Sequence, residues 1–235
     1  MVKSKPLEGI KILDFTTIVM GPASTRILSD CGAQVIKIES STRSDTLRSA
    51  TPYKGEDPSP NRSGYFAMYN AGKLSLPINM RNPESVNFVK EHLVPWADIV
   101  VTAFTPRVLP MWDMTYADLT VIKPELIMLS ACLMGNTGPY ADLRGTGQLA
   151  AALSGWYENT GWPDKDPVGP YSAYADFVSW NYFIVAVMAA LDYRDRTGKG
   201  QYIDQSMFES TLQFAGPQLM YYLNEGKLTT RMGNQ

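Results

Sequence analysis

Short apolar runs alternate with amphipathic segments along the first half of the chain. Residues 10–15 and 34–39 are apolar runs with the length and composition of buried strands. Between them, residues 23–31 have the spacing of a helix, and Gly32 follows as a C-terminal glycine cap. This β-α-β opening is typical of a parallel sheet.

The same alternation continues further along the chain. Residues 83–93 predict a helix and residues 98–104 a strand, and the pair repeats as a short helix over 116–122 and a strand over 126–133. The intervening residues 40–64 are rich in Ser, Thr, Pro, Asn and Arg, so we expect a long surface loop there. Loops of that length in compact domains are usually functional or disordered.

The pattern of apolar and polar residues changes after Gly147. Residues 177–194 predict a long helix that is apolar on nearly all sides and therefore buried. Residues 201–205 read as a further strand, and residues 207–224 as a last helix interrupted at Gly216-Pro217. The whole pattern predicts an α/β fold, with a Rossmann-like parallel sheet flanked by helices.

Composition describes an ordinary soluble protein. The chain has 235 residues, of which 45% are hydrophobic and 19% charged. Its net charge of −2 gives no indication of nucleic-acid binding. Its longest uncharged apolar stretch, residues 183–191, is too short for a membrane span. Cys31 and Cys132 are far apart and fit reduced core thiols of a cytoplasmic protein. A single histidine, His92, in a polar helical stretch, leaves no zinc cluster of the usual kind, so we expect no metal.

The first β-α turn lacks the glycines of a dinucleotide site. Only Gly21 lies between the first strand and the first helix, so the G-x-G-x-x-G fingerprint is absent and a nicotinamide-dependent oxidoreductase is disfavoured. Glu39, at the end of the second strand, is then better interpreted as a solvated acid than as a ribose ligand.

Asp176 is the carboxylate of most interest. It lies between aromatic residues, directly before the long apolar helix. One interpretation is an ordinary helix N-cap. The other is a poorly solvated carboxylate kept ionised by nearby helix dipoles, and therefore a nucleophile.

An ordered series of motifs resembles the class III CoA-transferases, also called the CaiB/BaiF family, which include the formyl-CoA and carnitine CoA-transferases. The resemblance runs nearly end to end and rests on residues 6–16, Gly21-Pro22, 32–39, 70–75, 135–140, 189–191, 196–201 and Asp204. It implies that Asp176 attacks the donor thioester to give a mixed anhydride and CoA thiolate. The acceptor carboxylate then exchanges with the bound acyl group, and the thiolate recaptures the new acyl group.

The same resemblance implies the remaining site and the assembly. Coenzyme A, as acyl-CoA substrate, would be bound by Thr17, Ile18, Met20, Lys73, Phe104 and Arg144, with Lys73 and Arg144 on its phosphates. Residues 1–215 would form the N-terminal part of a large CoA-binding domain, and residues 216–235 the start of a linker to a smaller domain. We expect an interlocked dimer, as a homodimer or with a related subunit, and a glycine-rich loop supplied from beyond this chain.

Several departures from the family pattern limit these implications. Ala103 replaces a frequent Asn, and the basic residue expected soon after is displaced to Arg107. Thr146 stands where the related α-methylacyl-CoA racemases have their histidine, which favours a transferase over a racemase. Gly147 replaces an acid that many members carry, which leaves open a non-catalytic CoA-binding partner subunit. Residues 160–164 are similar to the two-subunit branch that includes benzylsuccinate CoA-transferase.

The sequence identifies neither the donor nor the acceptor acid, and four aromatic residues have two interpretations. In one interpretation these residues line an acyl pocket for a bulky acid, and in the other they belong to the core. The four residues are Trp156, Tyr157, Trp162 and Tyr174.

Overall fold

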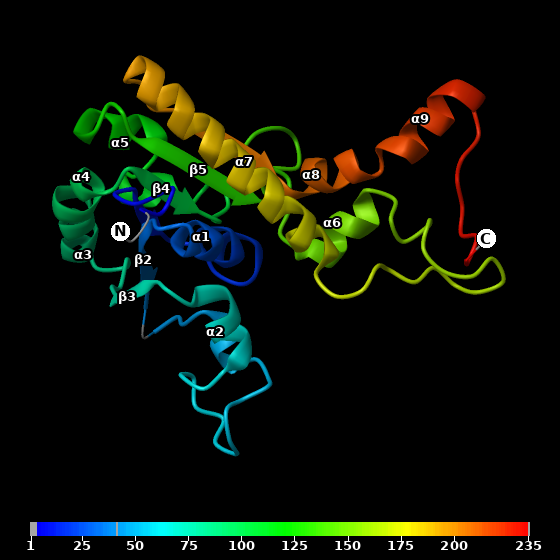
Figure 1. The fold of residues 1–235 in the computed structure, drawn as a ribbon, viewed down its shortest axis with the longest axis horizontal. Helices are drawn as coiled ribbons and strands as arrows, with labels where there is room; N and C mark the ends of the chain where they lie inside the picture. Colours follow the sequence, from blue (N-terminus) through cyan, green and yellow to red (C-terminus); the bar gives the residue numbers. More distant parts are fainter. Residues whose placement is uncertain (1–3, 41, 235) are drawn as a thin grey trace.

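The computed structural model describes residues 4–40 and 42–234. Its centre is one six-stranded sheet in the order β3-β2-β1-β4-β5-β6, and all neighbouring strands are parallel (Figure 1). The strands are β1 Lys11–Asp14, β2 Gln34–Glu39, β3 Leu74–Pro77, β4 Ile99–Thr102, β5 Ile127–Cys132 and β6 Tyr202–Ser206. This order is that of a doubly wound Rossmann sheet, so the predicted fold class is confirmed.

Helices cover both faces of the sheet. The α-helices are α1 Met20–Asp30, α2 Gly64–Asn70, α3 Pro83–Phe88, α4 Val94–Trp96, α5 Tyr116–Ile122, α6 Gly147–Leu153, α7 Tyr174–Thr197, α8 Met207–Phe214 and α9 Gly216–Glu225. Short irregular helices are η1 Thr46–Ser49, η2 Val89–Leu93 and η3 Leu109–Trp112. The segment predicted as one helix over 83–93 consists of α3 and the π-helical η2, and the helix continues beyond it through α4 to Trp96.

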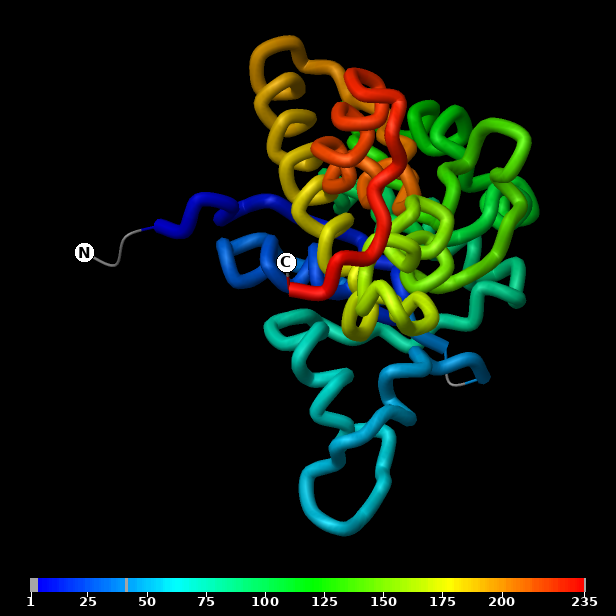
Figure 2. Tube along the Cα trace, turned by 90° about the vertical axis from the view of Figure 1, so that its right-hand side faces the viewer, coloured from blue at the N-terminus to red at the C-terminus, as the bar shows by residue number. Residues whose placement is uncertain are grey.

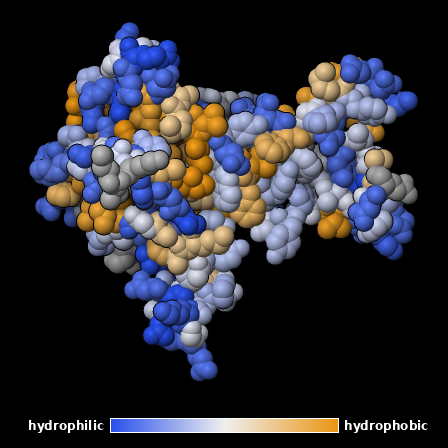
Figure 3. All heavy atoms as spheres, viewed as in Figure 1, coloured by the Kyte–Doolittle hydropathy of each residue, from blue (hydrophilic) through white to orange (hydrophobic). Residues whose placement is uncertain are grey.

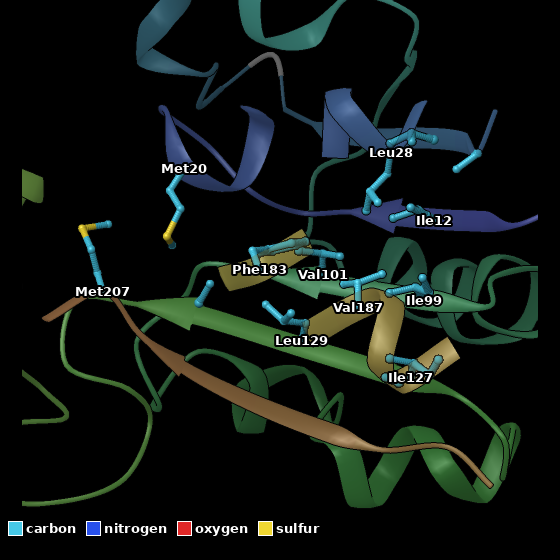
Figure 4. Close-up of a cluster of buried hydrophobic side chains, with 14 of the residues drawn as sticks. Ile12, Met20, Leu28, Ile99, Val101, Ile127, Leu129, Phe183, Val187 and Met207 are labelled. Atoms are coloured by element: carbon cyan, nitrogen blue, oxygen red, sulfur yellow. The ribbon is translucent and has the colours of Figure 1, made fainter. Parts of the chain in front are cut away.

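Two hydrophobic clusters hold these layers together. On one face, Ile12 of β1 packs with Met20 of α1 and Phe183 of α7, and all three are less than 5% exposed (Figure 4). On the other face, Leu13 of β1 belongs to a second cluster with Leu119 of α5. Successive residues of a strand point to opposite faces, which is why Ile12 and Leu13 serve different clusters.

Two segments extend away from the layered body. Residues 50–63 and α2 project from the sheet layer, and α9 leads away from it on another side (Figures 1 and 2). The chain after α9 returns along residues 155–170, where the amide of Gly233 donates a 2.9 Å hydrogen bond to the carbonyl of Gly161.

The predicted burial of α7 is wrong for one side of the helix. Phe183 and Val187 are fully buried, but Val185 is 66% and Met188 42% exposed, and apolar atoms are visible along this side (Figure 3). Strand β5 and helices α1, α6 and α8 pack against α7 and leave these side chains uncovered. Among the described residues, α7 is also the one helix long and apolar enough to cross a membrane, and 44% of its apolar window is buried in the fold. The core helix of a soluble protein passes the same test.

The loop predicted over 40–64 is only partly a surface loop. Asp45, Leu47 and Ser63 are buried, and Asp45 caps η1 by accepting a 3.0 Å hydrogen bond from the amide of Leu47. A hydrophilic composition indicated exposure, but these polar side chains are buried because backbone amides and carbonyls partner them.

Candidate active site

Asp176 is the third residue of α7 and is 7% exposed. The N-cap residue of that helix is Ala173, and it makes no side-chain cap hydrogen bond. Asp176 is therefore not the N-cap, which removes the simplest structural interpretation of this carboxylate. It lies instead in the first turn, where the helix dipole favours a negative charge.

Three helices begin beside this carboxylate. Met20 is the first residue of α1 and Gly147 the first of α6, and the amides of both, with that of Asp176 itself, lower the pKa of the Asp176 carboxyl. Figure 1 shows the start of α7 next to α6. Backbone amides at helix N-termini favour anions, so the arrangement suits a carboxylate or an oxyanion.

Gly147 makes this approach possible. A Cβ atom on residue 147 would overlap Oδ2 of Asp176 at a separation that real Cβ atoms do not show. In the sequence, Gly147 is notable only because it replaces an acid of the family pattern. The structure gives it a positive role, since the missing side chain leaves the volume that the Asp176 carboxylate occupies.

Burial dominates the charge state of Asp176. It raises the pKa of this carboxyl from 3.8 to about 6, against the opposing effect of the three amides. A carboxyl group with that pKa is mostly ionised at neutral pH while remaining poorly solvated. Such a carboxylate is a stronger nucleophile than one in bulk water.

Tyr69 of α2 lies in an apolar cluster with Phe177 and Trp180 of α7, close enough for the charge of Asp176 to affect its pKa. It is 4% exposed, and its pKa is raised by burial and then by the charges of Tyr65 and Asp176. The sequence carried no signal for this neighbour, because α2 and α7 are far apart along the chain and only the packing brings them together.

Five of the six residues expected to bind CoA lie at one edge of the sheet, four of them on loops and Met20 at the start of α1. Thr17 and Ile18 are exposed on the loop between β1 and α1, which ends at Met20. Phe104 follows β4, and Arg144 lies in the loop after β5 and is exposed. Because β1, β4 and β5 are parallel neighbours, their carboxyl ends open on the same edge, the usual ligand edge of such sheets.

Phe104 is part of a cluster of aromatic rings that meet at tilted and edge-on angles. Its ring centroid lies 6.4 Å from that of Phe15 and 5.3 Å from that of Trp112. The displaced basic residue, Arg107, is not free, since its guanidinium binds both carboxylate oxygens of Asp142 at 2.9 and 2.7 Å. Arg144, which the family resemblance assigns to a phosphate, is exposed at this edge.

Lys73 is separated from the other five by its contacts. Its side chain is 2% exposed, and its amine donates to Asp14 at 3.0 Å, the Pro22 carbonyl at 2.9 Å and Asn70 at 2.9 Å. An ammonium group has three protons, so none is left for a phosphate in this structure.

Other side chains singled out by the sequence have structural settings. Trp156, Tyr157 and Tyr174 pack against the core cluster of α7, whereas Trp162 is 55% exposed. The core interpretation therefore holds for the first three.

Glu39 is not a solvated acid. Arg48 donates to its two carboxylate oxygens at 2.8 Å each, and the Glu39 side chain is 9% exposed. The sequence could not pair it with Arg48, which lies in the segment expected to be a surface loop.

The two cysteines are free and partly buried. Burial and the charge of Asp204 raise the pKa of Cys132 to about 11, so this thiol is a poor nucleophile. His92 is exposed, as predicted. In the part of the chain that the structure describes, no group of three acidic, Cys or His side chains is placed to hold a metal ion.

Comparisons with known proteins agree with the sequence motifs. The family model described as CoA-transferase family III matches residues 7–235. An acetyl-CoA:oxalate CoA-transferase of Acetobacter aceti is 36% identical over 98% of this chain and 58% of the relative. A succinyl-CoA–L-malate CoA-transferase beta subunit of Chloroflexus aurantiacus is 32% identical over 97% of this chain and 56% of the relative.

A solved structure matches the whole described fold. The crystal structure of a CaiB/BaiF family protein from Brucella suis superposes with a TM-score of 0.92 at 36% identity. The match covers 99% of this chain and 61% of that one. The chain thus spans less than two thirds of the length of the relatives it matches.

Proposed function

Because this chain belongs to CoA-transferase family III, we propose that the protein containing it moves CoA from an acyl-CoA donor to a carboxylic acid acceptor through a covalent intermediate on Asp176. The observation that carries this proposal is the buried Asp176 carboxylate at the start of three helices, with the space left by Gly147 beside it. A structural aspartate has little reason to be desolvated there, whereas a nucleophile gains reactivity.

The reaction divides into exchanges that each keep atoms and charge balanced. A carboxylate oxygen of Asp176 attacks the thioester carbon of the donor, the C–S bond breaks, and CoA leaves as a thiolate. The acceptor carboxylate attacks the aspartyl carbonyl carbon of the resulting anhydride and releases the donor acid. The thiolate then attacks the acceptor acyl carbon, which gives the new acyl-CoA and returns Asp176 as a carboxylate.

Each attack passes through a tetrahedral oxyanion that needs hydrogen-bond donors. The amides of Met20 and Gly147 lower the pKa of the Asp176 carboxyl, so we assign them as the donors that this chain supplies to an oxyanion formed on the aspartyl carbon. Fixed donors at helix N-termini need no reorganisation as charge develops, which is the main advantage of such a site.

We assign the CoA contacts to the edge loops. Thr17, Ile18 and Met20 would lie along the CoA chain near the thioester, Phe104 beside it, and Arg144 on a phosphate. Lys73, whose protons are taken by protein acceptors, is better assigned to joining β1, α1 and α2 through Asp14, Pro22 and Asn70. No metal is needed for this chemistry.

We further propose that the protein acts as an interlocked dimer in the cytoplasm, as a homodimer or with a related subunit. The exposed apolar side of α7 and the two free cysteines support an assembled protein of a reducing compartment. A second candidate, a non-catalytic CoA-binding partner subunit, is favoured by the Chloroflexus relative that is named a beta subunit and by the loss of an acid at Gly147.

The experiment that tests the transferase is an isotope-exchange assay on the full-length protein with any partner it requires. Donor acid carrying a label should enter its own CoA thioester without an acceptor, because the exchange needs only the aspartyl anhydride. Asp176→Ala should abolish the exchange while CoA binding, measured by calorimetry, persists. Undiminished exchange in Asp176→Ala would place the reaction elsewhere and favour the partner-subunit candidate.

A further inference from the structure

Four charged side chains are buried beneath the loop between β1 and α1. Asp14 and Lys37 are directly paired residues of the neighbouring strands β1 and β2. Asp45 comes from the segment after β2, and Lys73 directly precedes β3. Each of the four side chains is at most 2% exposed. Two anions and two cations leave the group neutral.

The charges form two ion pairs. Lys73 Nζ lies 3.0 Å from Asp14 Oδ2, and Lys37 Nζ lies 3.1 Å from Asp45 Oδ2. The second contact is a charge pair without the alignment of a hydrogen bond. Burial would raise the pKa of Asp14, but the ammonium groups of Lys73 and Lys37 and the hydroxyls of Thr16 and Thr25 hold it well below its usual range.

Three backbone atoms of the loop are bound by this group. The amide of Thr16 donates to Asp14 at 2.8 Å, and the carbonyl of Thr16 accepts from Lys37 at 2.6 Å. The amide of Ile18 donates to Asp45 at 3.2 Å. Asp14, Lys37 and Asp45 therefore fix the loop directly, and Lys73 completes the charge balance of Asp14.

The loop held in this way contains a strained residue. Ile18 has φ = 68°, a left-handed conformation that a β-branched side chain rarely adopts. Strain of this kind persists only where the surroundings impose it, and it is common at functional sites. Its amide is the one bound by Asp45, so the buried charges hold the strained position.

The loop ends at the candidate active site. Met20, two residues after Ile18, is the first residue of α1, which packs against α7, and its amide lowers the pKa of the Asp176 carboxyl. Thr16 packs so closely on Gly21 that a Cβ there would clash with it, which couples the start of the loop to the first turn of α1.

We propose that the ion pairs Asp14–Lys73 and Lys37–Asp45 are positioning residues, which hold the loop from Thr16 to Met20 in the strained conformation that keeps the Met20 amide on Asp176. This inference rests on the proposed function of Asp176. Buried ion pairs are a weak source of stability compared with apolar side chains of similar size, so their presence here points to positioning.

The test compares two charge-neutral double variants of the full-length protein. Lys37→Met with Asp45→Leu removes the pair and the acceptor of the Ile18 amide. Lys37→Met with Asp45→Asn removes the same charges but keeps a side-chain oxygen for that amide. Leu119→Ala, in the core cluster of the opposite face, serves as a control for general destabilisation.

Three quantities are measured on each variant. They are the hydrogen exchange of the Ile18 and Met20 amides, the single-turnover rate of Asp176 acylation, and the pH at which this rate falls on the acid side of its profile (its acid limb). We expect the Leu variant to exchange these amides at least about tenfold faster and to lose about tenfold or more in rate. Its acid limb should move to higher pH, because the Met20 amide lowers the Asp176 pKa. The Asn variant should retain most of the rate, and Ile18→Gly should recover part of it in the Leu variant, since glycine adopts the left-handed conformation without strain.

Equal rates and equal amide exchange in the Leu and Asn variants would overturn the inference. The inference would also be overturned if Leu119→Ala lost as much thermal stability as the Leu variant and lost as much of the acylation rate. If the wild type does not acylate Asp176 at all, the proposed function fails. Amide exchange then decides the positioning claim alone, with faster exchange in the Leu variant supporting it and unchanged exchange overturning it.

Discussion

The carboxylate of Asp176 occupies the space that a side chain at Gly147 would fill. The two residues belong to different helices, and the contact depends on glycine being the first residue of α6. It gives a glycine of a short helix a direct influence on the residue that we assign as nucleophile.

Gly147→Ala should therefore displace Asp176 and lower the acylation rate by about 100-fold, since small displacements of a reacting group carry large costs. The added methyl group should also destabilise the fold by about 1–3 kcal/mol through overpacking. Single-turnover kinetics and thermal unfolding measure the two effects. Gly216→Ala is the matched control, because a Cβ there meets nothing within 4 Å. A Gly147→Ala protein with the wild-type rate would show that the contact has no part in catalysis.

The raised pKa of Asp176 predicts how stability depends on pH. Because this pKa is about 6 in the folded protein and 3.8 for an ordinary Asp, the folded state holds the proton more tightly. The resulting stability is complete below pH 3.8 and is lost as the pH rises to about 6. The loss amounts to about 3 kcal/mol, at 1.36 kcal/mol per pKa unit.

Asp176→Asn cannot ionise, so it should unfold at a higher temperature than wild type at about pH 8 and lose most of this advantage at about pH 4. Calorimetry at both pH values checks the difference between the two proteins, in which the other titrating groups cancel. A difference independent of pH would contradict the assigned pKa.

Lys73 and Arg144 should respond differently to removal of their charge. Lys73→Met leaves Asp14 buried without its ammonium partner and should destabilise the fold by about 3–5 kcal/mol. Arg144→Ala should leave stability unchanged, because Arg144 is exposed, and should raise the KM for acyl-CoA by about tenfold through loss of a phosphate contact. Denaturant unfolding and steady-state kinetics separate the two effects. A stable Lys73→Met protein with a raised KM would restore Lys73 as a CoA ligand.

Much of the architecture followed from local pattern. The strand over 34–39 and the helix over 116–122 have the predicted bounds, because each has a clear apolar periodicity and a marked end. The break at Gly216-Pro217 separates α8 from α9 as expected. Side-chain burial was less predictable, since the exposed side of α7 depends on which neighbours pack against the helix.

The sequence singled out the residue at the centre of the proposed site but not the residues that surround it. Asp176 stood out because of its aromatic neighbours and its family motif. The sequence did not single out Lys37, because its partner Asp45 lies in a segment whose composition indicated a surface loop. Tyr69 and the volume at Gly147 depend on contacts between distant segments, which no periodicity records.

The central claim is that Asp176 becomes acylated, and chemical trapping tests it most directly. Full-length protein, with any partner subunit it requires, is incubated with acyl-CoA and quenched with hydroxylamine, and the masses of its peptides are measured. We predict a hydroxamate on the peptide that contains Asp176, and its absence in Asp176→Ala. An unmodified Asp176 peptide in a protein that still exchanges CoA would contradict the account and move the nucleophile to another residue or chain.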